Sequence, residues 1–409
     1  MAVLKVDADP AEVGFDPDRL GRIDTHFARY VDDGRLAGWT IAVARRDRVV
    51  HLSHYGLADV EAARPVDDDT LWRIYSMTKP VTSVAALMLY ERGQLALTDP
   101  VAQYLPAFAD LRVYRGGSAA NPGTEPAAEP VRIWHLLTHT AGLTYGFHHA
   151  HPVDEVYRSR GFEFGVPHGM DLAAACDAWA GIPLVHQPGA EWNYSVATDV
   201  LGRVVEVVSG QPLDEFFDDE ILRPLDMTAT GFGAADPDRL AALYVPRPAG
   251  GGLHRHDRMG DAALREPTFL SGGGGLVSTA ADYHRFTRML ARGGELDGAR
   301  LLGPRTVAYA TRNHLPGNAD LQEFGRPIFA ESAFQGIGFG LGFSVVVDAA
   351  AGKALTSDGE YAWGGLASTA FYVDPVEEIT AMFFTQLMPS STYAIRPQLR
   401  TLVTQALVD

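Results

Sequence analysis

A serine and a lysine three residues apart are the first pair in this sequence that could do covalent chemistry. Residues 75–80 are Tyr-Ser-Met-Thr-Lys-Pro, and an apolar stretch runs from Val84 to Tyr90. Proline is tolerated in a helix only within its first turn, so the helix must begin close to Ser76. Residues three apart share a helical face, and a helix this apolar is buried. The spacing predicts a hydroxyl and an amine at the start of a buried helix, whose dipole favours an oxyanion.

Ser76 becomes a nucleophile only if a base takes its proton. A lysine can act as that base only when neutral, and burial or nearby positive charge lowers its pKa from the usual value of about 10.4. Arginine could not replace it, because a guanidinium does not lose its proton in proteins. The chain has only three lysines, Lys5, Lys79 and Lys353, among 34 basic residues. Lysine at position 79 therefore favours a chemical role, and a capped helix with a chance lysine is the alternative.

Two later segments could complete such a site. Tyr194 stands at the mouth of a predicted helix over 196–209, where its phenol could carry a proton between Ser76 and a leaving group. Gly364 and Gly365 follow Trp363 and lead into a predicted strand over 366–373. Glycines there allow close backbone approach, so a backbone N–H could face Ser76 in an oxyanion hole. Taken alone, Tyr194 also fits a core position, and the glycines also fit a simple turn.

Strand signals at both ends of the chain frame these segments. Apolar residues at helical spacing predict a first helix over 20–31, and Pro397 precedes a predicted terminal helix over 398–408. The middle of the chain is richer in helical signals, such as those over 196–209 and 213–222. Because the strand signals flank this middle, we expect an α/β lobe from residues 1–90 and 270–409 and a mostly helical lobe from residues 91–269. The strands are predicted over 39–44, 49–53, 343–348, 366–373 and 379–385.

In this order, the three segments resemble the serine β-lactamase and penicillin-binding protein superfamily. The resemblance is closest to the class C β-lactamase-like esterases called family VIII carboxylesterases, and it covers roughly residues 12 to 390. Ser76 to Lys79 is similar to the Ser-x-x-Lys box, and Tyr194-Ser195-Val196 is similar to the Tyr-x-Asn box. Trp363-Gly364-Gly365 stands where the lactamases carry Lys-Thr-Gly. Residues 135–143 and 272–281 are supporting stretches.

The resemblance implies an antiparallel sheet lobe flanked by helices, beside a mostly helical lobe. Ser76 would form an acyl-enzyme, with Lys79 and Tyr194 activating first the serine and then the deacylating water. The backbone N–H groups of Ser76 and Leu366 would form the oxyanion hole. Asp199 would be a supporting partner, unless it is a carboxylate on a helix surface. The residues expected to contact the substrate are Trp363, Gly364, Gly365 and Tyr145.

Departures from the family pattern bear on the substrate. Valine occupies position 196 in place of asparagine, and no Lys-Thr-Gly occurs, since Lys353 is followed by Ala354-Leu355. The lactamases use that lysine and asparagine to hold the carboxylate and amide of a β-lactam, so their loss favours neutral esters. The chain also lacks a Ser-Asp-Asn box and a Gly-x-Ser-x-Gly elbow, which disfavours a class A β-lactamase and an α/β-hydrolase.

Four functions compete on this evidence. The first is a carboxylesterase, and the second is an acyltransferase in which an alcohol deacylates the same acyl-enzyme; fungal statin side-chain acyltransferases share similar boxes. The third is a peptidase or amidase, weak β-lactamase activity included, and the fourth is a non-catalytic binder. The intact Ser76, Lys79 and Tyr194 disfavour the binder. We expect the carboxylesterase.

Composition limits the partners. The net charge of −17 gives no support for nucleic-acid binding. The sequence contains no apolar run of 18 residues, so no membrane span is expected. We expect a small-molecule ester as substrate, no cofactor, and a cytoplasmic location, since no signal peptide is seen and Cys176 is the single cysteine. Cys176 is predicted to be a buried thiol.

Three more features of the sequence could suggest a function: a histidine cluster, a glycine run and a long irregular segment. His148, His149 and His151 are predicted to form a loop at a pocket rim or in solvent, and no metal site is expected there. Close backbone packing explains the glycines at 272–275 better than a phosphate cradle, because no Lys-Ser/Thr follows them. The long segment 145–167 contains glycines that could act as hinges, so a mobile lid is a further hypothesis.

Overall fold

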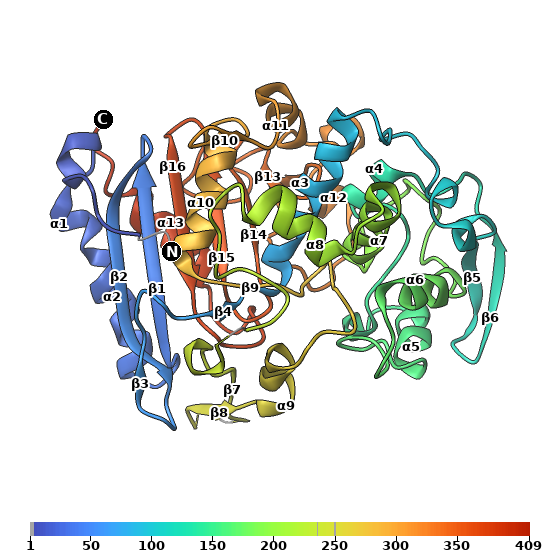
Figure 1. Cartoon of the computed structure of the whole chain (residues 1–409), viewed down its shortest axis with the longest axis horizontal. Helices are drawn as coiled ribbons and strands as arrows, with labels where there is room; N and C mark the ends of the chain where they lie inside the picture. Colours follow the sequence, from blue (N-terminus) through green and yellow to red (C-terminus); the bar gives the residue numbers. More distant parts are fainter. Residues whose placement is uncertain (1–3, 235, 249–250) are drawn as a thin grey trace.

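An antiparallel sheet joins the two ends of the chain (Figure 1). The computed structural model describes residues 4–234, 236–248 and 251–409. The strands of the sheet are β1 (Gly38–Arg45), β2 (Arg48–Asp59), β3 (Arg64–Pro65), β12 (Ile337–Phe339), β13 (Ser344–Val346), β14 (Tyr361–Gly364), β15 (Ala370–Asp374) and β16 (Ile379–Phe384). Their order is β12-β13-β14-β15-β16-β1-β2-β3, so β1 lies directly beside β16. The prediction that strands from both termini share one antiparallel sheet is confirmed.

Four smaller strand pairs lie outside this sheet. One of them pairs β4 (Trp72–Arg73) with β9 (Val277–Ser278), and β4 lies just before the candidate serine in the chain. The other three are β5 (Arg112–Ser118) with β6 (Asn121–Pro126), β7 (Tyr244–Pro246) with β8 (Leu253–Arg255), and β10 (Glu295–Leu296) with β11 (Ala299–Arg300).

Helices supply most of the remaining regular structure, and those from the middle of the chain gather beside the sheet (Figure 1). Their bounds are α1 (Pro17–Leu20), α2 (Arg22–Asp32), α3 (Thr78–Glu91), α4 (Ile133–Leu137), α5 (Pro152–Ser159), α6 (Leu172–Ala180), α7 (Ala197–Ser209), α8 (Leu213–Phe217), α9 (Asp257–Gly260), α10 (Ala280–Ala291), α11 (Pro304–Ala310), α12 (Leu321–Phe324) and α13 (Ile395–Thr404). The division of the chain into two lobes at residues 90 and 270 stays a prediction. Within the described residues, no helix combines the length and apolarity that a membrane crossing requires.

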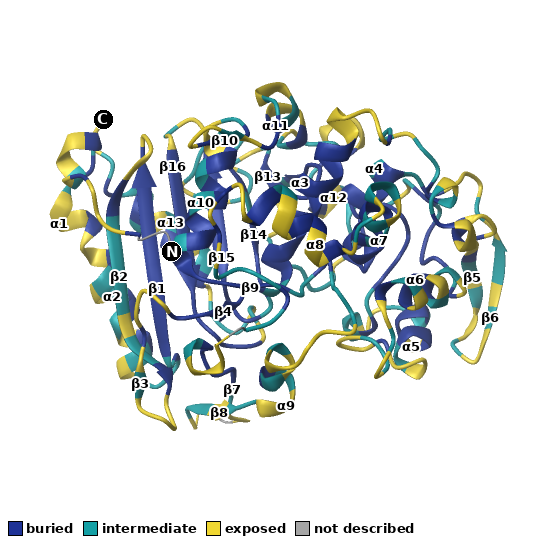
Figure 2. Cartoon of the chain, viewed as in Figure 1, coloured by how far each residue is buried: buried dark blue, intermediate teal, exposed yellow. Residues whose placement is uncertain are grey.

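The sheet separates two apolar cores, because successive side chains of a strand point to opposite faces. On β1, Ile41 and Val43 pack with the buried faces of α2 and α13. The alternate residues Ala42 and Ala44 face the larger core, which includes α3 and α10. Figure 2 shows β1, β16 and α3 as almost wholly buried. The sheet therefore forms a rigid wall against which α3 is fixed.

Helix α3 is the element that carries the candidate serine and lysine. Every residue from Thr78 to Leu89 is buried, as its apolar composition predicts. A short 3₁₀ helix over Tyr75–Met77 precedes it, and Pro80 lies in its first turn. The predicted position of Ser76, just before the start of a buried helix, is confirmed.

Three predicted boundaries differ from the structure. The predicted first helix is divided at Gly21 into α1 and α2, and the terminal helix begins at Ile395 with Pro397 inside its first turn. The predicted strand over 366–373 is wrong at its start, since β14 ends at Gly364 and β15 begins at Ala370. Between them, the N–H of Gly365 donates to the carbonyl of Thr369 at 2.9 Å, which closes a turn instead of continuing a strand.

A buried ion pair fixes α13 to the sheet. Arg400 donates through Nε to both carboxylate oxygens of Glu360, at 2.9 and 2.8 Å, and the Glu360 side chain is wholly buried. Glu360 directly precedes β14, so this pair joins the last helix to the strand that leads to Trp363.

We predict that Glu360→Gln destabilises the fold without acting on the chemistry. The substitution leaves the Arg400 guanidinium without its counter-charge, which is expected to lower the free energy of unfolding by about 3 kcal/mol. Urea denaturation of wild type and variant measures this difference. An unchanged midpoint and slope would show that the pair contributes nothing to stability.

Candidate active site

Ser76 opens onto a pocket from the turn that precedes α3. Tyr75, the residue before it, has φ of 42°, in the left-handed region that tyrosine seldom occupies. This conformation ends the β4 segment and starts the short helix that contains Ser76. Ser76 is 8% exposed and lines the pocket together with Tyr75. The strained turn thus places the hydroxyl at the pocket wall while α3 stays buried behind it.

The structure brings Ser76, Lys79 and Tyr194 together. The phenol of Tyr194 donates to Oγ of Ser76 at 2.6 Å, and Nζ of Lys79 donates to the same Oγ at 3.3 Å. Nζ also donates to the hydroxyl of Tyr145 at 3.0 Å and to the carbonyl of Gly273 at 2.7 Å. Ser76 and Lys79 come from the start of α3, and Tyr194 stands three residues before α7. One serine hydroxyl therefore contacts both a phenol and an amine.

Burial sets the protonation of these groups. It lowers the pKa of Lys79 to about 8, while the carboxylates of Glu331 and Asp199 oppose this shift. Burial also raises the pKa of Tyr194 well above its usual value, and the negative charge of Glu331 adds to that effect. Tyr194 is therefore a neutral phenol near neutral pH, and Lys79 can change its charge within the physiological range.

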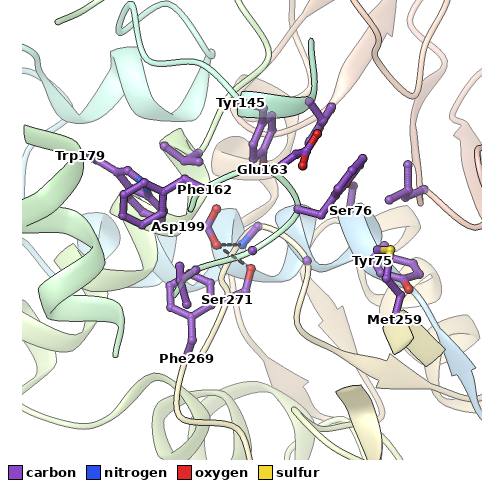
Figure 3. Close-up of a pocket in the computed structure, with 18 of the residues that line it drawn as sticks. Tyr75, Ser76, Tyr145, Phe162, Glu163, Trp179, Asp199, Met259, Phe269 and Ser271 are labelled. Atoms are coloured by element: carbon purple, nitrogen blue, oxygen red, sulfur yellow. Dashed lines mark hydrogen bonds between the residues drawn. The ribbon is translucent and has the colours of Figure 1, made fainter. Parts of the chain in front are cut away.

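Asp199 holds the glycine-rich segment that binds Lys79. Its Oδ1 accepts from the hydroxyl of Ser271 at 2.6 Å and from the N–H of Gly273 at 2.9 Å (Figure 3). Asp199 is buried, so it is not a carboxylate on a helix surface. A Cβ on Gly273 would lie 2.6 Å from Oδ2 of Asp199, and one on Gly272 would lie 2.8 Å from the carbonyl of Thr198. The predicted close backbone packing of these glycines is confirmed.

The β14–β15 turn brings Leu366 to the pocket wall with Ser76. Within the described parts of the chain, the N–H groups of Ser76 and Leu366 donate to no backbone carbonyl. Gly365 makes this approach possible, because a Cβ there would lie 2.3 Å from the carbonyl of Ile74. These two N–H groups could therefore form an oxyanion hole, and that role for them stays a prediction.

Trp363 and Gly364 lie behind the pocket instead of lining it. The indole of Trp363 packs edge-on against the ring of Tyr194, with centroids 5.5 Å apart, and the guanidinium of Arg396 covers Gly364. Tyr145, in contrast, lines the pocket. Trp363 thus packs behind Tyr194 and supports its ring. A contact between Trp363 and the substrate stays a prediction.

The pocket has a volume of about 210 Å³ and mostly apolar walls. The segment 145–166 covers one side, where Phe147 stacks on Phe164 with centroids 5.6 Å apart. Helix α5 within this segment is anchored by Asp154, which accepts from the hydroxyl of Thr144 at 2.8 Å. Motion of this segment as a lid stays a hypothesis. The apolar side chains on the walls are Phe147, Phe162, Phe164, Val166, Trp179, Val196, Met259, Phe269 and Leu366 (Figure 3).

Sequence reasoning missed Glu331, a buried acid that lines the same pocket. It lies in an irregular loop between α12 and β12, where no periodic pattern or motif marks it. The hydrogen bond from Lys79 to Tyr145 was also missed. The position of Glu331 in the pocket and the bond between Lys79 and Tyr145 both depend on tertiary contacts, so neither can be read from the sequence.

The histidines and the cysteine have supporting positions. Nε2 of His148 donates to the carbonyl of Tyr194 at 2.7 Å, and His139 packs against the Tyr194 ring. Among the residues that the structure describes, no three potential metal ligands form a cluster. Cys176 is buried, as predicted.

This chain is similar to known proteins over most of its length. The family described as Beta-lactamase matches residues 23–405. Esterase EstB of Burkholderia gladioli is 34% identical over 397 residues, which cover 92% of this chain and 93% of that protein. Monacolin J acid methylbutanoyltransferase of Aspergillus terreus is 29% identical over 361 residues, 82% of each protein.

Solved structures agree with these sequence matches. The structure of EstCE1, described as a hydrolase with promiscuous acyltransferase activity, superimposes with a TM-score of 0.79 at 28% identity and covers 95% of this chain and 99% of that chain. Because the family match extends from residue 23 to residue 405 and EstB aligns over nearly its whole length, this chain belongs to the Beta-lactamase family of serine hydrolases.

Proposed function

We propose that this protein is a serine carboxylesterase that hydrolyses small-molecule esters through an acyl-enzyme on Ser76. The observation that carries the proposal is the double contact of Oγ with the phenol of Tyr194 at 2.6 Å and with Nζ of Lys79 at 3.3 Å, at the wall of an apolar pocket. The relatives EstB and EstCE1 support it, since the first is named an esterase and the second a hydrolase.

The proposed reaction has two halves. Oγ of Ser76 attacks the ester carbonyl, and Tyr194 and Lys79 take part in the transfer of the serine proton. The N–H groups of Ser76 and Leu366 stabilise the oxyanion. Protonation of the leaving alcohol by Tyr194 completes the acyl-enzyme. Water then takes the place of the alcohol, and the same groups activate it for deacylation. No step requires a cofactor.

The charges on the pocket wall favour neutral esters. The walls carry Glu163, Asp199 and Glu331, and no arginine or lysine lines them among the described residues. A carboxylate such as that of a β-lactam would meet three acids on the walls, and the cation behind them, Lys79, already donates to Ser76, Tyr145 and Gly273. The valine at position 196 adds an apolar surface in place of an amide. Amide-directed activity, weak β-lactamase activity included, is therefore the less favoured proposal.

Acyl transfer to an alcohol is the second candidate. A methylbutanoyltransferase is among the relatives, and EstCE1 is described as having promiscuous acyltransferase activity. The stacked Phe147 and Phe164 could bind the apolar part of an acceptor alcohol. However, Phe164 is 57% exposed at the pocket rim, so water can also reach the acyl group. We therefore place hydrolysis first.

We predict rapid hydrolysis of p-nitrophenyl acetate and butyrate by the wild type, and slow hydrolysis of nitrocefin. Ser76→Ala is expected to lower kcat/KM for the esters by at least about 10⁴-fold, because the other serine on the wall, Ser271, donates to Asp199 and has no hydrogen bond to Lys79 or Tyr194. Release of p-nitrophenol measures the esters. Ester turnover that persists in Ser76→Ala would exclude the assigned nucleophile, and fast nitrocefin turnover would contradict the charge argument.

We also predict that water outcompetes added alcohol. When p-nitrophenyl butyrate is turned over in the presence of 1-propanol, butyric acid is expected to exceed propyl butyrate, because the exposed rim admits water. Gas chromatography of both products gives the ratio. An excess of propyl butyrate at low alcohol concentration would instead establish the acyltransferase.

Asp199 provides a test of how the site is held. Asp199→Ala leaves the N–H of Gly273 without its acceptor, so the free energy of unfolding is expected to fall by about 1–3 kcal/mol. The carbonyl of Gly273 that binds Lys79 would also shift, and a loss of about 10- to 100-fold in kcat is expected. Asp199→Asn is the matched control, because it keeps an acceptor oxygen for Ser271 and Gly273. Equal losses in both variants would show that the carboxylate charge matters more than the hydrogen bonds.

A further inference from the structure

Glu331 is a buried carboxylate that the reaction described above does not use. It is 4% exposed and lines the pocket that contains Ser76. Its carboxylate and the phenol of Tyr194 shift each other's pKa, so the two groups are neighbours, while the phenol proton itself is directed to Oγ of Ser76 at 2.6 Å. Within the described residues, Oε2 of Glu331 has no hydrogen-bond partner. A buried carboxylate oxygen without a donor is costly, so a role for it must be sought in the reaction.

Charge balance favours a cationic Lys79 in this site. Four ionisable groups lie in the buried region: Glu331 interacts with the cations Lys79 and Arg396, and Asp199 interacts with Lys79. The two charges of each sign balance only while Lys79 keeps its proton. The neighbours of Nζ agree, since three oxygen atoms match the three N–H bonds of an ammonium, and the carbonyl of Gly273 can only accept.

The phenol of Tyr194 also needs a partner. Its high pKa means that it holds its own proton at neutral pH, so it can accept the serine proton only while it passes its own to another group. Lys79 as an ammonium cannot take that proton. Glu331 is the carboxylate against the phenol, and it has an unpartnered oxygen.

We propose that Glu331 is the terminal proton acceptor of this site, reached from Ser76 through Tyr194, while Lys79 stays cationic and stabilises the alkoxide. This inference rests on the proposed function and adds Glu331 to the same reaction. It also replaces the neutral Lys79 that the sequence predicts as a base with a cationic Lys79. It makes a Ser-Tyr-Glu relay out of contacts that come from three separate segments of the chain, at residues 76, 194 and 331.

The proton count of the relay is balanced. In the resting structure the phenol proton points to Oγ of Ser76, so the relay begins as that proton turns to Glu331. As Oγ bonds to the acyl carbon, its own proton passes to the phenol oxygen of Tyr194 and the phenol proton passes to Glu331. The carbonyl electron pair moves onto the oxyanion. When the bond to the alcohol breaks, the proton on Glu331 returns through Tyr194 to the leaving oxygen. Water enters in place of the alcohol and deacylation repeats the same transfers, so that Glu331 is again a carboxylate at the end.

The relay fixes the sign of the pH dependence. Glu331 must be ionised, and burial raises the pKa of this carboxyl, while Lys79 and Arg396 oppose the shift. Lys79 must be protonated, and its pKa is about 8. The rate should therefore fall as the pH drops through the raised pKa of Glu331, and fall again as the pH rises above about 8. The other titratable groups that face this pair are Tyr145, Tyr194, Asp199, His139 and His148.

Glu331→Gln tests the relay, because it keeps the shape of the side chain and removes the acceptor. We expect a fall of at least about 100-fold at pH 7 in the acylation burst with p-nitrophenyl butyrate, and loss of the acidic limb of the pH profile. Labelling of Ser76 by a fluorophosphonate probe should slow by a similar factor. Glu331→Asp should recover part of the rate and the acidic limb, because it restores a carboxylate at a longer distance from Tyr194.

The opposite outcome has a clear meaning. If neutral Lys79 were the base, removal of the Glu331 charge would lower the pKa of Lys79 further and leave the rate at pH 7 equal or faster. That result, or a folded Glu331→Asp variant that recovers no rate and no acidic limb, would overturn the proposal. Glu360→Gln is the matched buried-carboxylate control, expected to lower stability and leave the pH profile unchanged.

The probe keeps this inference separate from the proposed function. If the wild type fails to hydrolyse p-nitrophenyl esters and yet its Ser76 is labelled, the esterase proposal fails while the labelling rates still test Glu331. If Glu331→Gln does not fold, the rate and pH profile of Glu331→Asp decide the question.

Discussion

The buried amine of Lys79, which carries a charge below its pKa of about 8, is the constraint around which the site is built. A charge at this depth is stable only if fixed oxygen atoms and opposite charges surround it, and the structure supplies the carbonyl of Gly273 at 2.7 Å, the hydroxyl of Tyr145 at 3.0 Å and two acids. The glycines beside Gly273 have no Cβ because the backbone must come this close. Asp199 then holds that backbone in place. One buried charge thus explains a glycine run, a buried aspartate and a tyrosine.

Rigid packing fixes the reacting groups relative to one another. Ser76 precedes α3, Tyr194 precedes α7, and Leu366 lies in the β14–β15 turn, so each reacting group stands at the end of a regular element. Helix α3 packs against α7 and is buried almost throughout, which leaves little freedom for Ser76 and Tyr194 to separate. The distance of 2.6 Å between their oxygen atoms is a consequence of this packing. Groups held in this way need little reorganisation during reaction.

The charges on the pocket wall bear on the proposed substrate class. Its walls are aromatic and acidic, and its nearest guanidinium, Arg396, donates to the carbonyls of Glu331 and Gly365 behind the wall. A substrate without negative charge suits such a pocket. The same arrangement makes Glu331 available to Tyr194, because Arg396 keeps a buried acid beside the phenol electrostatically tolerable.

The sequence alone determined the elements that are local in origin. Ser76, Lys79 and Pro80 specify a helix start, and the apolar residues after them specify burial. Short apolar runs joined by turn residues specify the strands, because each of these signals depends only on neighbours along the chain. The motif order also determined the family, which the comparisons confirm. Only the tertiary structure decided the turn at Gly365, the place of Trp363 behind Tyr194, and the entry of Glu331 into the site. The turn is closed by the hydrogen bond from Gly365 to Thr369, and its approach to Ile74 exists only in the folded chain. The other two features depend on contacts between segments more than a hundred residues apart, and an irregular loop carries no periodic signal that predicts them.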